Sequence, residues 1–239
     1  MSKTIGLIGG MSWESTATYY SAINELVRER RGGLASAEIL MWSVDFESIV
    51  ALQKAGDWDG AAARLADVAR RLATAGAGCV LICTNTMHLV ADTVAAAIPV
   101  PLLNIIDVTG AALVAAGKKR PLLLATRYTM EHGFYTERMK AKAGLDPIIP
   151  EAGDRGVVHD VIFDELCCGR VREDSRAAFV EIIEKGRAAG ADSVILGCTE
   201  IGLLIGQEHS SLPIFDSTLL HAAAAVDFAA KDDLARAAE

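Results

Sequence analysis

The sequence predicts an α/β protein made of two similar lobes, each built around a parallel sheet. Short apolar runs alternate with longer helical patterns along the chain, which is typical of parallel α/β sheets. These runs are apolar almost throughout, as expected for strands covered on both faces. The motifs of the first half also return in the same order in the second half.

Six apolar runs are expected to form strands, three in each half of the chain. Each is short, rich in Ile, Leu or Val, and bounded by glycine, proline or polar residues. The runs cover residues 4–10, 37–44 and 79–83 in the first half, and 121–126, 146–150 and 193–198 in the second.

Two longer patterns between the strands predict amphipathic helices. In residues 57–76, leucine and valine recur every three or four positions, Asp57 or Asp59 can cap the start, and Gly76 can end the helix. Residues 175–190 repeat this design and also end in glycine. The two halves therefore carry equivalent helices as well as equivalent strands.

Three pairs of segments indicate an internal duplication. Residues 4–10 resemble residues 121–127, "TAGAGCVLICT" resembles "AAGADSVILGCT", and "VPLLNIID" resembles "LPIFDS". One such match could arise by chance, but three in the same order favour duplication. We therefore expect the two lobes to be related by a pseudo-twofold axis, with an active site in the cleft between them.

Composition and charge exclude several classes of protein. The chain has 239 residues, of which 51% are hydrophobic and 23% charged, so a folded globular protein is expected. A net charge of −8 argues against nucleic-acid partners and anionic membrane surfaces. No apolar segment approaches the ~20 residues of a membrane span. Five cysteines without framework spacing favour a reducing cytoplasm.

The most informative motif is a Cys-Thr pair that ends an apolar strand in each half. It occurs in "VLICTNTMH", with Cys83, and in "VILGCTEIG", with Cys198. Ligands of open α/β sheets bind beyond the carboxyl ends of the strands. If the two lobes face each other, Cys83 and Cys198 meet across one cleft.

Two opposed thiols beside a carboxylate site would suit racemisation. The start of a helix stabilises a thiolate, and its N–H groups, with the side chains of Thr84, Asn85, Thr86 and Thr199, can bind a carboxylate. One cysteine, as thiolate, would remove the α-proton, and the other would return a proton to the opposite face. A single buried cysteine is more often a small apolar residue, but the symmetric pair favours catalysis.

Three further residues are auxiliary candidates. His88 could tune Cys83 from one turn away, although capping or exposure to solvent explains it equally well. Glu200 could hold or relay a proton near Cys198, or be an ordinary carboxylate at a helix start. Asp45 lies at the end of the second expected strand. Cys79 is expected in the core, and Cys167 and Cys168 lie on a helical pattern.

No cofactor or metal site is expected. Gly6, Gly9 and Gly10 give G-x-x-G-G, which is not the dinucleotide fingerprint, and Asp45 follows too late for the ribose contact. These glycines instead allow close approach of a small anion, with Ser12, Ser15 or Thr16 capping the next helix. Neither a phosphate loop, a Schiff-base lysine context nor zinc spacing is found.

Four segments together resemble the aspartate/glutamate racemase family, the cofactor-independent two-cysteine amino-acid racemases. They are "GLIGGMSWEST", "CTNTMH", "LLATRYTME" and "GCTEIGLL", and the chain is most similar to the broad-range bacterial branch. The resemblance implies a small-molecule amino-acid substrate, a homodimer, and a C-terminal helix that returns to the first lobe. The expected lobes are residues 1–106 with 214–239, and residues 107–213.

The resemblance also assigns site residues. Cys83 and Cys198 would be the catalytic bases. Substrate contacts would come from Met11, Gln53, Thr84, Asn85, Thr86, Thr126 and Thr199.

One departure from the family bears on specificity. Acid-selective members carry a lysine where this chain has Cys167, which we keep as a candidate contact, and a second basic residue where Phe46 and Glu47 stand. Arg127 is the remaining nearby cation, so broad specificity is expected.

Two other hypotheses for the function stay open. One is a cysteine-dependent isomerase or decarboxylase of a small diacid such as maleate or a malonate. A decarboxylase would need only one proton-donating cysteine, whereas two matched cysteines favour the racemase. The other is a small-molecule binding protein that keeps the site without turnover.

Overall fold

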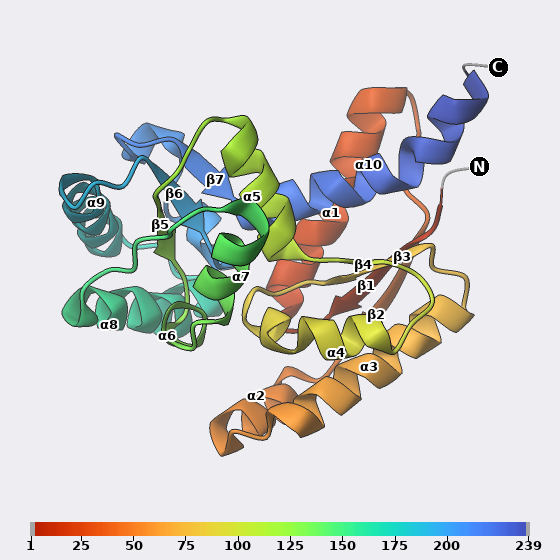
Figure 1. Cartoon of the computed structure of the whole chain (residues 1–239), viewed down its shortest axis with the longest axis horizontal. Coiled ribbons are helices and arrows are strands. Elements are labelled where there is room, and N and C mark those ends of the chain that lie inside the picture. The colour runs from red at the N-terminus through yellow and green to blue at the C-terminus, as the bar shows by residue number, and fades with distance from the viewer. Residues whose placement is uncertain (1–2, 238–239) are drawn as a thin grey trace. The chain divides into compact units, whose positions relative to one another are not determined.

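The computed structural model describes residues 3–237, with side chains through residue 230. Two compact units divide the chain: one runs to Asn104 and resumes at His221, and the other is Ile105–Leu220. Each has its own parallel sheet flanked by helices (Figure 1), which confirms the α/β class. The expected grouping, 1–106 with 214–239 and 107–213, differs in residues 105–106 and in residues 214–220. Residues 214–216 belong to the second unit because their strand, β7, pairs with β6.

The sheet of the first unit has four parallel strands in the order β2-β1-β3-β4. Ile5 of β1 lies opposite Ile39 of β2 and Cys79 of β3, so β1 and β3 are interior strands. Both are buried along their whole length, in agreement with their continuous apolar sequence. The strands are β1 Ile5–Gly9, β2 Ile39–Ser43, β3 Cys79–Ile82 and β4 Leu102–Leu103.

Helices cover both faces of this sheet and form two separate cores. One core joins Ile8, Val80 and Ile82 to helices α2, α3 and α4; the other joins Leu7 and Leu81 to α1 and α10. The elements are α1 Trp13–Arg31, α2 Phe46–Ala55, α3 Trp58–Thr74, the 3₁₀ helix η1 Thr86–Val90, α4 Ala91–Ala96 and α10 Ser217–Ala237.

The second unit has three parallel strands in the order β5-β6-β7, with β6 in the centre. Its core packs β5 and β6 against helices of both flanks. The strands are β5 Pro121–Leu124, β6 Ser193–Leu196 and β7 Ile214–Asp216. The helices are α5 Ile105–Ala115, α6 Arg127–Glu131, α7 Phe134–Ala143, α8 Ala152–Asp160, η2 Val161–Glu165, η3 Leu166–Cys168, α9 Glu173–Ala188, η4 Thr199–Leu203 and η5 Gln207–His209.

Helix starts follow the capping residues that the sequence indicates. Ser12 caps α1 by accepting the N–H of Ser15, and Asp57 caps α3 by accepting the N–H of Gly60 at 2.8 Å. Gly10 has φ +89, and a Cβ there would lie 2.2 Å from the carbonyl oxygen of Val44. Only glycine therefore fits the turn that leads from β1 to α1.

Four segments differ from the expected elements, and two of them are the strands β4 and β7, which were not expected. Residues 146–150 form one parallel bridge, Leu122 to Ile148, and not a strand, because pairing stops after a single residue pair. The helical pattern that contains Cys167 and Cys168 widens into the π-helical η2 and then tightens into the 3₁₀ η3. Gly169, in the left-handed region at φ +69, ends it.

Candidate active site

The first half of the candidate site is the loop that follows the interior strand β3. The backbone N–H of Cys83 donates to the carbonyl of Ile8 at 2.9 Å, so the sheet pairing extends to the cysteine. The Cys83 side chain is fully buried in the core formed with α1 and α10. Asn85 and Thr86, which follow it, are buried polar residues. The sequence placed these groups correctly at the strand end.

Other predicted residues of the first unit gather near Met87. Met11 lies in the turn after β1 and packs in the same core as Met87. Gln53, on α2, directs its side-chain amide to the sulfur of Met87 at 3.1 Å. Asp45 has a local structural role, because its carboxylate caps α2 by accepting the N–H of Ser48 at 3.1 Å. Its contribution to the site stays a prediction.

The second half of the candidate site follows the central strand β6. The Cys198 thiol is half-buried and donates to a carboxylate oxygen of Glu200 at 3.0 Å. Glu200 itself is only 5% exposed. A buried carboxylate that accepts a thiol hydrogen bond is placed to take the proton, and the role of Glu200 as a proton relay stays a prediction.

Thr126 and Cys167 also lie in the second unit. Thr126 follows β5, is buried, and shares a hydrogen bond with Thr129 at 3.2 Å. Cys167 packs against the same core as Cys198 and acts on it electrostatically. Because Cys83 and Cys198 belong to different units, their meeting across a common cleft stays a prediction.

Two opposing effects act on the cysteine thiols: the start of a helix favours a thiolate, whereas burial favours the thiol. Burial raises the pKa of Cys83 far above its usual value. Burial, followed by the charge of Glu200 and its hydrogen bond, raises the pKa of Cys198. The expected thiolate stays a prediction, and the helices η1 and η4 at these positions are 3₁₀ helices of only five residues.

His88 is buried and belongs to a polar cluster that the sequence analysis missed. Its Nδ1 lies 2.8 Å from the carbonyl oxygen of Thr84, and its ring meets the ring of His221 edge-on, with centroids 5.7 Å apart. His221 is in turn 2.8 Å from the hydroxyl of Tyr19. The sequence does hold one indication of the cluster: His221 is a polar residue next to an alanine-rich stretch of α10.

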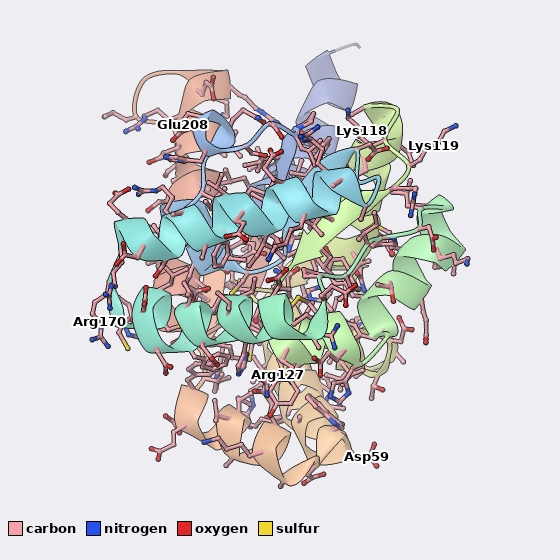
Figure 2. The ribbon with its side chains drawn as sticks, turned by 90° about the vertical axis from the view of Figure 1, so that its left-hand side faces the viewer. Asp59, Lys118, Lys119, Arg127, Arg170 and Glu208 are labelled. Carbon is pink, nitrogen blue, oxygen red and sulfur yellow. The ribbon has the colours of Figure 1, made fainter. Side chains whose placement is uncertain are left out.

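Arg127 lines a cavity of about 380 Å³ in the second unit. Figure 2 shows it beside α8, and its backbone N–H donates to Nδ1 of His159 at 3.3 Å. Glu131, also in the lining, is paired with Arg155 at 2.8 Å. Burial and the charge of Arg127 lower the pKa of His159. The cavity is completed by Tyr128 and His132.

Within residues 3–237, no helix has both the length and the apolar character needed to cross a membrane. Among the side chains that the structure describes, His, Cys, Asp and Glu form no group of three or more that could hold a metal ion.

The comparisons with known proteins agree with this geometry. The family model Asp/Glu/Hydantoin racemase matches residues 8–225. A Yersinia pestis structure assigned to the Asp/Glu racemases is 48% identical, with a TM-score of 0.90, and the match covers 95% of this chain and 99% of that chain. An aspartate racemase homologue from Pyrococcus horikoshii OT3 is 32% identical, with a TM-score of 0.85 and the same coverage.

A mutant of arylmalonate decarboxylase shares the fold. It is 17% identical to this chain, with a TM-score of 0.56, and the match covers 95% of this chain and 93% of that chain.

Proposed function

The chain belongs to the Asp/Glu/hydantoin racemase family, and from that premise we propose that it racemises amino acids with two cysteines and without a cofactor. One observation carries the proposal: a Cys-Thr pair follows an interior strand of the parallel sheet in each unit. Cys83 and Cys198 are the two acid–base groups. Each handles the α-proton on one face of the substrate.

The proton transfers start from two thiols, in agreement with the raised pKa values. When Cys198 is the base, its proton passes to Glu200, and the thiolate then takes the α-proton of the substrate. The electron pair of the broken C–H bond moves into the carboxylate as an enediolate. Cys83 donates its proton to the opposite face of the α-carbon and becomes a thiolate. The reverse reaction retraces these steps: the Cys83 thiolate takes the α-proton of the other enantiomer, Cys198 returns its proton to the α-carbon, and the Cys198 thiolate regains the proton held by Glu200.

The substrate carboxylate is held by groups of the loops that follow the strands. Backbone N–H groups and side chains there supply hydrogen bonds that strengthen as charge moves onto the carboxylate. The proposed contacts are Met11, Gln53, Thr84, Asn85, Thr86, Thr126, Cys167 and Thr199. These groups bind atoms that all amino acids share, so they set the reaction and not the side chain.

Specificity is proposed to be broad. A distal carboxylate needs a positive partner, because burying it unpaired is costly. Cys167 and Phe46 carry no charge, and Phe46 packs into the core of the first unit. Arg127 is the candidate cation, but its side chain is exposed in the lining of its cavity. Acidic and uncharged amino acids are therefore both expected substrates.

Exchange of the α-proton in deuterium oxide tests the proposal. The protein is incubated with single enantiomers of aspartate, glutamate, homoserine and methionine, and deuterium at the α-carbon is measured by mass spectrometry alongside optical rotation. A racemase gives a deuterated product of the opposite configuration. Release of carbon dioxide from a malonate without amino-acid exchange would identify a decarboxylase. Binding without either reaction would identify a binding protein.

A homodimer is proposed, with α1 and the edge strand β2 at its interface. Trp13, Tyr20 and Met41 are large, exposed and line one cavity of about 360 Å³ over these elements. Exposed aromatic and methionine side chains are enriched at protein interfaces. Light scattering should give twice the chain mass, and Trp13→Glu should shift the protein toward the monomer.

A cytoplasmic location is proposed as well. All five cysteines are free thiols in the structure, which suits a reducing compartment. Fractionation of cells that produce the protein, followed by immunoblotting, tests this location.

A further inference from the structure

Three buried polar side chains of the first unit, Tyr19, His221 and His88, contact one another in series. The proposed proton transfers do not use them. The hydroxyl of Tyr19 lies 2.8 Å from Nδ1 of His221, and Nε2 of His221 lies 2.8 Å from the carbonyl oxygen of Leu103. The His221 ring then packs edge-on against the ring of His88. The chain of contacts ends at Thr84, one residue beyond Cys83.

The partners of each ring fix where its proton resides. A carbonyl oxygen only accepts, so Nδ1 of His88 carries the hydrogen that is donated to Thr84. Nε2 of His221 likewise donates to Leu103, which leaves its Nδ1 to accept the hydroxyl hydrogen of Tyr19. Burial, and then the nearby His88, lower the pKa of His221 to about 3, so this ring is neutral at physiological pH.

The hydrogen bond to Thr84 has a geometric consequence for the next residue. The carbonyl of Thr84 and the N–H of Asn85 belong to one planar trans peptide, so they point in opposite directions. When His88 holds the carbonyl, it also sets the direction of the Asn85 N–H. Asn85 is one of the residues proposed to bind the substrate carboxylate, so the orientation of its peptide affects that contact.

We propose that His88 is a positioning residue that aims the Asn85 N–H and steadies the Cys83 loop, with His221 and Tyr19 holding its ring in place. The proposal rests on the racemase function argued above. Tyr19, Cys83 and Ala222 pack in the same core, so a displacement of His221 is transmitted to the cysteine as well. None of the three residues touches the substrate in this scheme.

The choice between asparagine and glutamine at residue 88 tests the proposal. The side-chain amide nitrogen of asparagine takes the place of Nδ1, whereas that of glutamine takes the place of Nε2. His88→Asn should therefore keep the bond to Thr84 and stay within about threefold of wild-type kcat/KM. His88→Gln should lose about 100-fold, with KM raised as well as kcat lowered, as expected for a misplaced binding group.

Two different outcomes distinguish a failure of the positioning role from a failure of the racemase function. Wild-type protein without α-proton exchange would refute the racemase. Active wild-type protein with equal kcat/KM in His88→Asn and His88→Gln would refute the positioning role. Melting temperatures of the two variants are compared, because a purely structural role would lower stability without the difference in KM between asparagine and glutamine.

Tyr19, the residue of this series most distant from Thr84, can be tested against a matched control on the same helix, α1. Tyr19→Phe removes the hydroxyl that holds His221, while Thr18→Val removes the hydroxyl of an exposed residue one position away. Tyr19→Phe should lower kcat/KM about tenfold, as expected from a smaller displacement than the loss of the His88 bond itself. Thr18→Val should leave kcat/KM unchanged. Equal values for both variants would remove Tyr19 and His221 from the proposal.

Discussion

The loop after β3 and the loop after β6 occupy equivalent places in two parallel sheets but surround their cysteines differently. Cys83 is fully buried among apolar side chains. Cys198 is half-buried and donates to the carboxylate of Glu200. The two loops thus share the position of the thiol and not its surroundings. One loop presents a thiol alone, and the other presents a thiol with its own proton acceptor.

Replacing either cysteine should have the largest effect on catalysis. Cys83→Ser and Cys198→Ser should each lower racemisation at least about 1,000-fold, because a serine hydroxyl is too weak an acid and base for the transfer. Each variant should keep slow α-proton exchange with one enantiomer only, measured in deuterium oxide. Circular dichroism of the amino acid follows racemisation, and near-wild-type turnover in either variant would exclude the two-base mechanism.

Replacing Glu200 tests whether its carboxylate accounts for the difference between the two loops. Glu200→Gln should lower turnover about 100-fold for the enantiomer that uses Cys198 as base, because the proton acceptor is lost. The same change removes a negative charge that raises the pKa of the Cys198 thiol. Alkylation of Cys198 by iodoacetamide should therefore begin at lower pH, while that of Cys83 stays as in wild type.

The buried His221 predicts a stability change with pH that belongs to the first unit. Its folded-state pKa is about 3, below the unfolded value of about 6.5. Between these values the unfolded chain binds a proton that the folded chain does not, so stability falls as pH falls. The loss between pH 7 and pH 5 should be about 2 kcal/mol. Urea unfolding of wild type and His221→Gln tests this, since the variant should lack that part of the slope.

The smallest effect is expected at the cavity of the second unit. Arg127→Ala should change kcat/KM by less than about threefold for aspartate and homoserine alike, because an exposed guanidinium contributes little to binding in water. A substrate panel measured with both proteins tests this. Wild-type activity restricted to acidic amino acids and lost in Arg127→Ala would make Arg127 the selector and would exclude broad specificity.

The sequence predicted what depends on local pattern. Continuous apolar runs identified β1, β3 and β6, and the Cys-Thr pairs located both strand-end loops. Asp57 and Ser12 were expected as caps because capping depends on a few neighbouring residues. The single bridge at Ile148 was not predicted, because whether an apolar run finds a pairing partner depends on residues distant in sequence.

The features of the site that the sequence did not predict have the same origin. The protonation of Cys83 depends on its burial by α1 and α10, which no local motif encodes. Tyr19 and His221 meet although about 200 positions separate them in sequence. Their hydrogen bond comes from the packing of two helices on one sheet face, so spacing rules could not reveal it.

The depth of Cys83 also bears on how the protein withstands oxidants. Peroxide and electrophiles attack thiolates, so a thiol whose pKa is raised by burial reacts slowly with both. Cys168, by contrast, is exposed at the end of η3. Under oxidative stress we expect sulfenic acid to form first at Cys168, so that oxidation begins at a thiol outside the proposed catalytic pair.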